Sequence, residues 1–264
     1  MTINQWQPDN FALEATTHWS FPEHGCWATH DSSWRGNWSP YIPRNLILRY
    51  SKEGDLILDQ FVGGGTTLVE AKLLNRNIVG VDCNDAAIKR SKEKTAFHYD
   101  KANGVVYIKK GDARHLDFVK DNSIDLICTH PPYANIIQYS DNIPEDLSRL
   151  QIRDFLDEMK PVASECFRVL KKSGFCAILM GDTRQNGCMI PISFEVMKIL
   201  QDVGFTLKET IIKEQHNCHA TEYWKKRSIK YNFLLIAHEY LFVFRKQSKM
   251  YDNTINRGSV NKSL

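Results

Sequence analysis

Three short apolar runs of this chain each close on an aspartate, at Asp59, Asp82 and Asp112. Segments of helical pattern follow the first two runs, and strands that alternate with helices are typical of a mainly parallel sheet. In an open α/β sheet, ligands bind outside the carboxyl ends of the strands. We therefore expect an α/β fold with these three acidic groups at the edge of the sheet that binds a ligand.

A glycine loop, Gln60–Thr67, separates the first run from its helix. Glycines let the backbone pass close to a ligand and adopt positive φ, and the threonines at the end of the loop suit a helix N-terminus. The loop has neither the G-x-G-x-x-G spacing nor the G-K-[ST] ending of phosphate-binding loops. Asp82 lies 19 positions after Gly63, where an acid can bond ribose hydroxyls, and Asp112 is placed to bond an adenine edge. The set favours a cofactor that has a nucleoside and an amino-acid tail but no phosphate.

A proline turn, His130–Tyr133, follows the apolar run Ile124–Thr129. Proline fixes φ and has no N–H, so the strand must end there. The turn then presents a polar side chain, rigid carbonyls and an aromatic ring at the carboxyl end of the strand. A carbonyl can accept a hydrogen bond from an amino group while the ring stacks on a flat base. A proline-rich surface turn is the alternative for this motif taken alone.

Residues 59–71, together with Gly80–Asp82, resemble motifs I and II of the amino-methylating DNA methyltransferases. Residues 129–133 resemble motif IV of that family, and residues 237–246 resemble its closing strand. The resemblance covers roughly residues 40–246. It implies a Rossmann-like methyltransferase fold: a mainly parallel seven-stranded sheet with an antiparallel final strand and helices on both faces.

The resemblance implies S-adenosyl-L-methionine as cofactor and, as target, the exocyclic amino group of a base flipped out of DNA. It assigns cofactor binding to Asp59, Phe61, Gly63, Gly65, Thr66, Thr67, Asp82 and Asp112, and catalysis to His130, Pro131, Pro132 and Tyr133. We expect the base to stack on Tyr133 while the Pro131 carbonyl and a neutral His130 accept its amino hydrogens. No covalent intermediate is needed, so Cys128 is not a nucleophile. His130 stands where the family has Asp, Asn or Ser, which slightly favours cytosine-N4 over adenine-N6.

Two further segments combine aromatic and basic residues. Residues 1–38 form an arm with five of the six tryptophans, and we expect aromatic anchors to hold it against the catalytic domain, residues 39–247. Within that domain, residues 213–230 form an insertion that is either a solvated charged loop or a DNA contact. The candidate nucleic-acid-binding residues are Arg35, Tyr139, His216, Trp224, Lys225 and Arg227. We expect the tail, residues 248–264, to be disordered.

Composition narrows the remaining possibilities. The net charge of +3 neither requires nor excludes nucleic acid, and no apolar run approaches the ~20 residues that span a bilayer. Seven scattered cysteines indicate reduced thiols in a cytoplasmic protein. His216, Cys218 and His219 are spaced too tightly for a zinc site, so we expect no metal.

Several alternatives stay open from the sequence. The expected partner is DNA. The recognised DNA sequence is short, or a homodimer or a partner subunit contributes to its recognition. One competing function is an RNA amino-methyltransferase, which uses a similar proline turn. Another is a catalytically inactive cofactor- or DNA-binding subunit of a modification complex, which His130 in place of the usual residue would favour.

Overall fold

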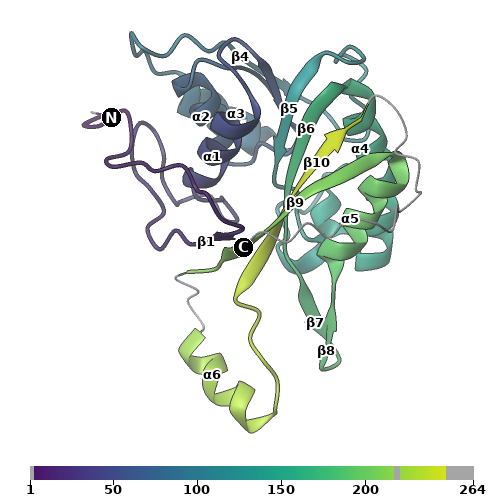
Figure 1. The fold of residues 1–264 in the computed structure, drawn as a ribbon. Coiled ribbons are helices and arrows are strands. Elements are labelled where there is room, and N and C mark those ends of the chain that lie inside the picture. Colours follow the sequence, from purple (N-terminus) through teal and green to yellow (C-terminus); the bar gives the residue numbers. More distant parts are fainter. Residues whose placement is uncertain (1–2, 217–220, 248–264) are drawn as a thin grey trace, which may run out of the picture.

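The computed structural model describes residues 3–216 and 221–247, and these form one α/β unit around an eight-stranded sheet (Figure 1). The tail, residues 248–264, lies outside the described residues, as do Cys218 and His219 of the rejected metal site. The strand order is β1-β9-β10-β6-β5-β2-β3-β4. The strands are β1 (His18–Trp19), β2 (Leu56–Asp59), β3 (Asn77–Asp82), β4 (Val106–Lys110), β5 (Ile124–Thr129), β6 (Leu170–Met180), β9 (Phe205–Glu214) and β10 (His238–Lys246).

The central strands run parallel, and β10 is antiparallel to both of its neighbours. This confirms the expected seven strands and the antiparallel final strand. The short β1 adds an eighth strand, because residues of the arm pair in parallel with β9 through His18 and Ile212. No periodic pattern in the sequence of the arm predicts this pairing.

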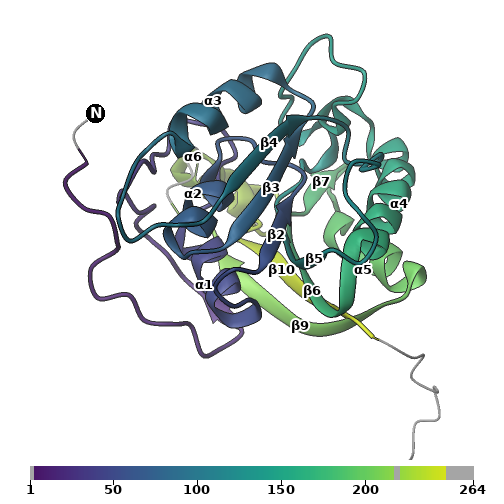
Figure 2. The ribbon, with the colours of Figure 1, turned by 90° about the horizontal axis from the view of Figure 1, so that it is seen from above.

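Helices cover both faces of the sheet (Figure 2). On one face lie α1 (Tyr41–Tyr50), α2 (Thr66–Leu73) and α3 (Asp85–Thr95), and on the other lie α4 (Ile152–Val169) and α5 (Ile192–Val203). Neighbouring strand residues point to opposite faces, so Ile57 packs in the α1–α2 core and Leu58 in the α4–α5 core. Strands that are buried on both faces read as continuous apolar runs, which is why the sequence pattern was informative.

Three local features complete the fold. β6 begins at Leu170, directly after the end of α4, so residues 171–174 belong to the strand, and β10 begins at His238. The segment after β6 forms a separate hairpin of β7 (Thr183–Gln185) and β8 (Cys188–Ile190). The segment after the proline turn contains two short 3-10 turns, Ala134–Ile136 and Leu147–Arg149.

The insertion forms α6 (Thr221–Lys230), which projects beyond the body of the molecule beside the β7–β8 hairpin (Figure 1). The insertion leaves from the end of β9 and returns at the start of β10, which is antiparallel, so it lies at the edge where the parallel strands end. Among the described residues, no helix is long and apolar enough to cross a bilayer.

Candidate active site

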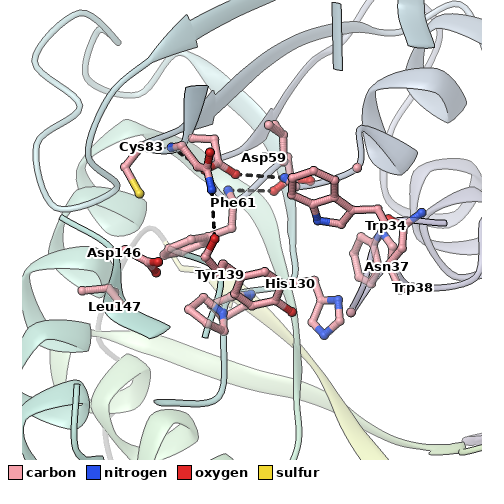
Figure 3. Close-up of a pocket in the computed structure, with 18 of the residues that line it drawn as sticks. Trp34, Asn37, Trp38, Asp59, Phe61, Cys83, His130, Tyr139, Asp146 and Leu147 are labelled. Carbon is pink, nitrogen blue, oxygen red and sulfur yellow. Dashed lines mark hydrogen bonds between the residues drawn. The ribbon is translucent and has the colours of Figure 1, made fainter. Parts of the chain in front are cut away.

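A pocket opens at the carboxyl ends of β2, β3 and β5 (Figure 3). It brings together three predicted segments: the glycine loop, the end of β3 and the proline turn. Figure 3 shows side chains of the arm on one side of this space and Asp146 and Leu147 on the other. The lining residues are Trp34, Gly36, Asn37, Trp38, Asp59, Phe61, Val62, Gly63, Gly64, Asp82, Cys83, Asn84, His130, Pro131, Pro132, Tyr139, Glu145, Asp146 and Leu147.

The glycine loop needs its glycines for two different reasons. Gly65 has φ +86 at the start of α2, a left-handed conformation that favours glycine. A Cβ on Gly64 would lie 2.9 Å from the Cβ of Trp34, so a side chain there would collide with the arm. The loop is therefore packed tightly beneath the arm as well as shaped for a ligand.

Asp59 joins the ends of two strands to the glycine loop. One carboxylate oxygen accepts hydrogen bonds from the Phe61 N–H and the Thr129 hydroxyl, both at 3.0 Å, and the other accepts from the Thr67 hydroxyl at 2.6 Å. Burial raises the pKa of Asp59 to about 6, although these donors oppose the shift. Asp59 lines the pocket, and its bonds fix the shape of the loop.

Asp82 is the predicted ribose-binding acid, and its carboxylate faces the same pocket. Its two oxygens accept from the backbone N–H groups of Gly63 and Asn84, each at 2.9 Å. Each carboxylate oxygen can accept a second hydrogen bond, so capacity remains for a ligand hydroxyl. Burial raises the pKa of Asp82 to about 6.

The lining of the pocket is acidic. Four carboxylate side chains line it, and no Lys or Arg does so among the described residues; the four are Asp59, Asp82, Glu145 and Asp146. Such a field repels phosphate and attracts cations. The residues present therefore fit a nucleoside ligand whose sulfonium and ammonium groups carry positive charge.

Four predicted cofactor residues do not line this pocket. Gly65, Thr66 and Thr67 lie behind the loop, where the Thr66 hydroxyl donates to Asn37 at 2.7 Å. The carboxylate of Asp112 is bound by the Arg114 guanidinium, with its closest contact at 2.7 Å. A direct contact between Asp112 and adenine therefore stays a prediction.

The proline turn places His130, Pro131 and Pro132 on the pocket lining. The ring of His130 stacks on Trp38 with centroids 5.4 Å apart. Burial lowers the pKa of His130 to about 4, so the imidazole is neutral at neutral pH. This meets the requirement that His130 be able to accept a hydrogen bond.

Tyr133 differs from the other three residues of the turn because it does not line the pocket, although its hydroxyl lies 2.6 Å from Nε2 of His130. Its hydroxyl donates to Glu239 at 2.9 Å, and its ring lies over Gly181, where a Cβ would approach the ring to 2.6 Å. One face of the ring is thus covered by backbone. Stacking of a base on its other face stays a prediction.

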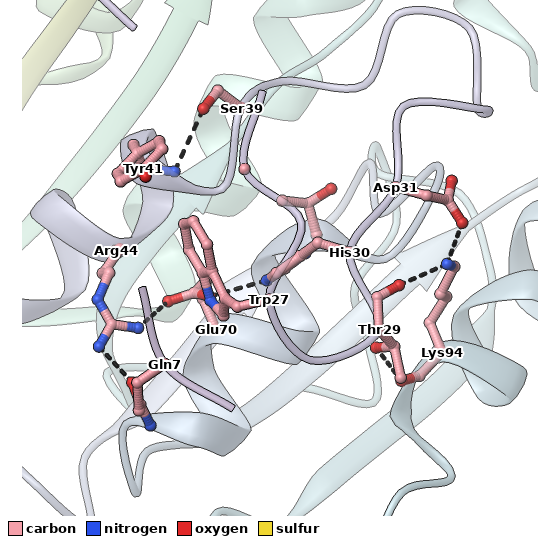
Figure 4. Close-up of polar contacts among 12 residues, drawn as sticks. Gln7, Trp27, Thr29, His30, Asp31, Ser39, Tyr41, Arg44, Glu70 and Lys94 are labelled. Carbon is pink, nitrogen blue, oxygen red and sulfur yellow. Dashed lines mark hydrogen bonds and ion pairs between the residues drawn. The ribbon is translucent and has the colours of Figure 1, made fainter. Parts of the chain in front are cut away.

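The arm supplies pocket residues that sequence reasoning missed, namely Trp34, Asn37 and Trp38. It is held by a buried carboxylate, Glu70 of α2 (Figure 4). Glu70 accepts from Trp27 at 2.7 Å, from His30 at 2.8 Å and from Arg44 of α1 at 2.8 Å. The cluster of tryptophans was the available signal, and their role as anchors is confirmed by the burial of Trp19, Trp27 and Trp38.

The candidate nucleic-acid residues fall into separate groups. Tyr139 lines the pocket, where its hydroxyl meets Gly36, and Arg35 is exposed nearby. His216 approaches the Ser20 hydroxyl at 3.0 Å and so lies beside the arm. The remaining three residues are exposed on α6: Trp224, Lys225 and Arg227.

A family model for DNA methylases of the N6/N4 type matches residues 9–93 and 124–262. The chain belongs to this family. Its members are amino-methylating enzymes that use S-adenosylmethionine, in agreement with the acidic, phosphate-excluding pocket.

Among curated proteins, the chain is 29% identical over 154 residues to the type II methyltransferase M.MjaVI of Methanocaldococcus jannaschii. That alignment covers 57% of this chain and 75% of the relative. The chain is also 34% identical over 123 residues to a tRNA (guanine(10)-N2)-dimethyltransferase of Methanothermobacter thermautotrophicus, covering 46% of this chain and 34% of the relative.

The fold of this family member is shared with solved methyltransferases. A SAM-dependent methyltransferase from Methanosarcina mazei matches with a TM-score of 0.55 at 16% identity, covering 76% of this chain and 97% of that one. TrmN from Thermus thermophilus matches with a TM-score of 0.55 at 17% identity, covering 80% and 50%. The predicted Rossmann-like methyltransferase fold is thereby confirmed.

Proposed function

We propose that this methyltransferase acts on DNA and methylates the exocyclic amino group of a flipped base, with cytosine-N4 favoured slightly over adenine-N6. The observation that carries the proposal is that the glycine loop, Asp82 and the proline turn line one pocket. A cofactor held by the first two lies against the segment that would receive the amino group. The similarity to M.MjaVI supports DNA as the substrate.

The residues divide the work in this proposal. Asp82 binds the ribose hydroxyls, the loop backbone lies along the cofactor, and Phe61 supplies an apolar wall. The Pro131 carbonyl and the neutral His130 accept the two amino hydrogens, which turns the nitrogen lone pair toward the methyl group. The bound cofactor supplies an activated methyl on a sulfonium, so most of the acceleration comes from alignment and exclusion of water.

The base preference follows from the residue at the head of the turn. His130 replaces the Asp that, at this position of the motif, favours methylation of adenine. A neutral His130 offers one nitrogen as a hydrogen-bond acceptor. Trp38 stacks on His130, which makes this corner of the pocket aromatic. We propose cytosine-N4 on that basis.

Nucleic-acid binding is assigned to α6 and the hairpin beside it. Arg227 lies over the rings of Tyr223 and Trp224, at 4.5 and 5.5 Å from their centroids. Arg184 of the hairpin donates to the Leu234 carbonyl at 3.1 Å, which ties the two projections together. Exposed rings beside cations suit stacking on bases and contacts to phosphates.

A second candidate is methylation of RNA, which the 34% identity to the tRNA dimethyltransferase favours. Incubation with radiolabelled S-adenosylmethionine and either DNA or tRNA, followed by mass spectrometry of the nucleosides, separates the candidates. N4-methylcytosine supports the proposal, N6-methyladenine corrects the base, and N2-methylguanosine replaces DNA with RNA. No incorporation into either polymer indicates the inactive-subunit alternative.

A further inference from the structure

A chain of hydrogen bonds runs behind the proline turn and ends on His130. Lys213 of β9 donates to one oxygen of Glu239 at 2.8 Å, and the Tyr133 hydroxyl donates to the other at 2.9 Å. The Tyr133 oxygen lies 2.6 Å from Nε2 of His130. Glu239, on β10, is only 7% exposed, so the chain is shielded from water.

The chemistry of these groups determines which partner donates in each hydrogen bond. The Lys213 ammonium can only donate, and an ionised Glu239 can only accept. Burial acts to raise the pKa of Glu239, but Lys213 and the other donors outweigh it and the pKa is lowered, which keeps the carboxylate ionised. The single proton of Tyr133 is therefore committed to Glu239.

The Tyr133 oxygen must then accept its second hydrogen bond from His130. Nε2 of His130 consequently carries the proton, and Nδ1 carries the lone pair of the neutral ring. Among the described residues, Nδ1 has no hydrogen-bond partner, and the ring lines the pocket beside Pro131.

We propose that Lys213, Glu239 and the Tyr133 hydroxyl are positioning residues that hold His130 in the Nε2–H tautomer, so that Nδ1 accepts a proton of the substrate amino group. This inference rests on the proposed function. During transfer the nitrogen–carbon bond forms as the carbon–sulfur bond breaks. The proton released from the nitrogen passes to Nδ1 and then to water, and the sulfonium becomes a neutral thioether. A histidine can thus occupy a position where the family uses a side-chain oxygen.

The charges around this chain predict the pH dependence. Glu239 on β10 raises the pKa of His130, while burial and Lys213 on β9 lower it, and burial dominates. Asp182 after β6 and Tyr139 face the other member of the pair, Tyr133. Protonation of Nδ1 abolishes its acceptor role, so kcat should fall with decreasing pH through the pKa of His130, about 4 in the free protein.

The tautomer can be read directly by long-range ¹H–¹⁵N NMR on the full chain labelled with ¹⁵N-histidine. The wild-type protein at pH 7 should show Nε2 protonated and Nδ1 unprotonated at His130. Tyr133→Phe keeps the ring but removes the hydroxyl, so the two tautomers should mix. We expect kcat to fall about 10-fold in this variant while KM for the nucleic acid is unchanged. This is less than the ~10²–10⁴-fold loss expected on removal of a general base itself, because His130 is retained.

Glu239→Gln removes the negative charge that raises the pKa of His130, so the acid limb of the pH profile should move to lower pH. Two matched controls should keep the wild-type tautomer and profile. Tyr50→Phe alters a tyrosine whose ring packs at a tilt against Phe175, and Glu209→Gln alters an exposed ion pair with Lys208 on β9. Thermal unfolding of each variant identifies any effect that comes from misfolding.

Protonation of Nδ1 rather than Nε2 in the wild-type protein would overturn the inference, as would wild-type kcat and pH profile in Tyr133→Phe. The proposed function fails in a different way, through absence of methyl transfer to any nucleic acid. The NMR measurement needs no substrate, so the two failures are distinguishable.

Discussion

The arm and the insertion have similar compositions, but three tryptophans of the arm are buried and that of the insertion is exposed. Both combine tryptophan with histidine and basic residues, yet Trp19 and Trp27 of the arm are 1% and 2% exposed, whereas Trp224 of α6 is 42% exposed. The difference lies in the surface that each segment meets. The arm finds a buried acceptor in Glu70, and α6 projects away from the sheet. Aromatic content alone therefore does not distinguish an anchor from a binding surface.

The two regions also differ in charge. The pocket beneath the arm is lined by carboxylates, while α6 carries Lys225, Lys226, Arg227 and Lys230. If the assignment is right, changes at the arm and its pocket affect stability and cofactor binding, and changes on α6 affect nucleic-acid binding alone. Four predictions test this contrast.

The largest effect is expected at the anchor of the arm. Glu70→Ala leaves the buried Arg44 guanidinium and the His30 and Trp27 N–H groups without their acceptor, which should lower the free energy of unfolding by about 3–5 kcal/mol. Chemical denaturation measures the change. Asp157→Asn, at an exposed ion pair with Lys160, is the control and should leave the free energy of unfolding nearly unchanged. A loss for Glu70→Ala as small as this control would show that the arm is held by other contacts.

The next effect concerns the acidic pocket. Asp82→Asn should weaken S-adenosylmethionine binding by about 1.5–3 kcal/mol, the range for a hydrogen bond to a charged group. In the wild-type protein a cationic ligand favours the ionised carboxylates, so affinity should rise with pH through about 6, the pKa to which burial raises Asp82 and Asp59. Titration calorimetry checks both statements. Affinity that is flat between pH 5 and 7 would remove these carboxylates from cofactor binding, and Asp100→Asn, on a fully solvated turn, is the neutral control.

A smaller effect is expected on α6. Trp224→Ala should weaken DNA binding by about 1–3 kcal/mol, the contribution of one stacked base, and leave cofactor affinity unchanged. Fluorescence anisotropy with a labelled oligonucleotide measures it. Tyr107→Ala, an exposed aromatic at the opposite edge of the sheet on β4, is the matched control. Equal losses in both variants would indicate nonspecific effects rather than a binding surface.

The smallest effect is electrostatic. Arg227→Gln should reduce the slope of log affinity against log salt by about 1, because one phosphate contact is lost. The same titration on Lys92→Gln, at the end of α3, should leave the slope unchanged. An unchanged slope for Arg227→Gln would place the phosphate contacts elsewhere.

Much of the fold, and part of the pocket lining, could be predicted from local sequence patterns. The glycine loop, Asp82 and the proline turn each carry a pattern set by backbone geometry, so their positions at the strand ends were predictable. Trp34, Asn37 and Asp146 were not, because their place in the pocket depends on contacts between segments far apart in the sequence.

The hydrogen-bonded network behind His130 was equally hidden. Glu239 lies between His238 and Tyr240 at the start of an apolar strand, and nothing in that pattern reveals that its carboxylate accepts a hydrogen bond from Tyr133. Glu70 similarly reads as an ordinary helix residue, and only the packing of the arm makes it a buried acceptor. Polar residues whose role depends on partners far away in the sequence therefore cannot be identified from local patterns.

The pairing of His18 and Trp19 with β9 has a consequence for how the molecule behaves among its own copies. Without those two residues, the outer backbone groups at Ile212 and Lys213 would also face solvent, and the border of β9 that can accept an added strand would be longer. A chain trimmed to begin at Ser39 should therefore self-associate more readily through this border, which sedimentation velocity would measure. The arm thus shortens the open border of the sheet at β9, while its tryptophans shape the pocket at the carboxyl ends of the strands.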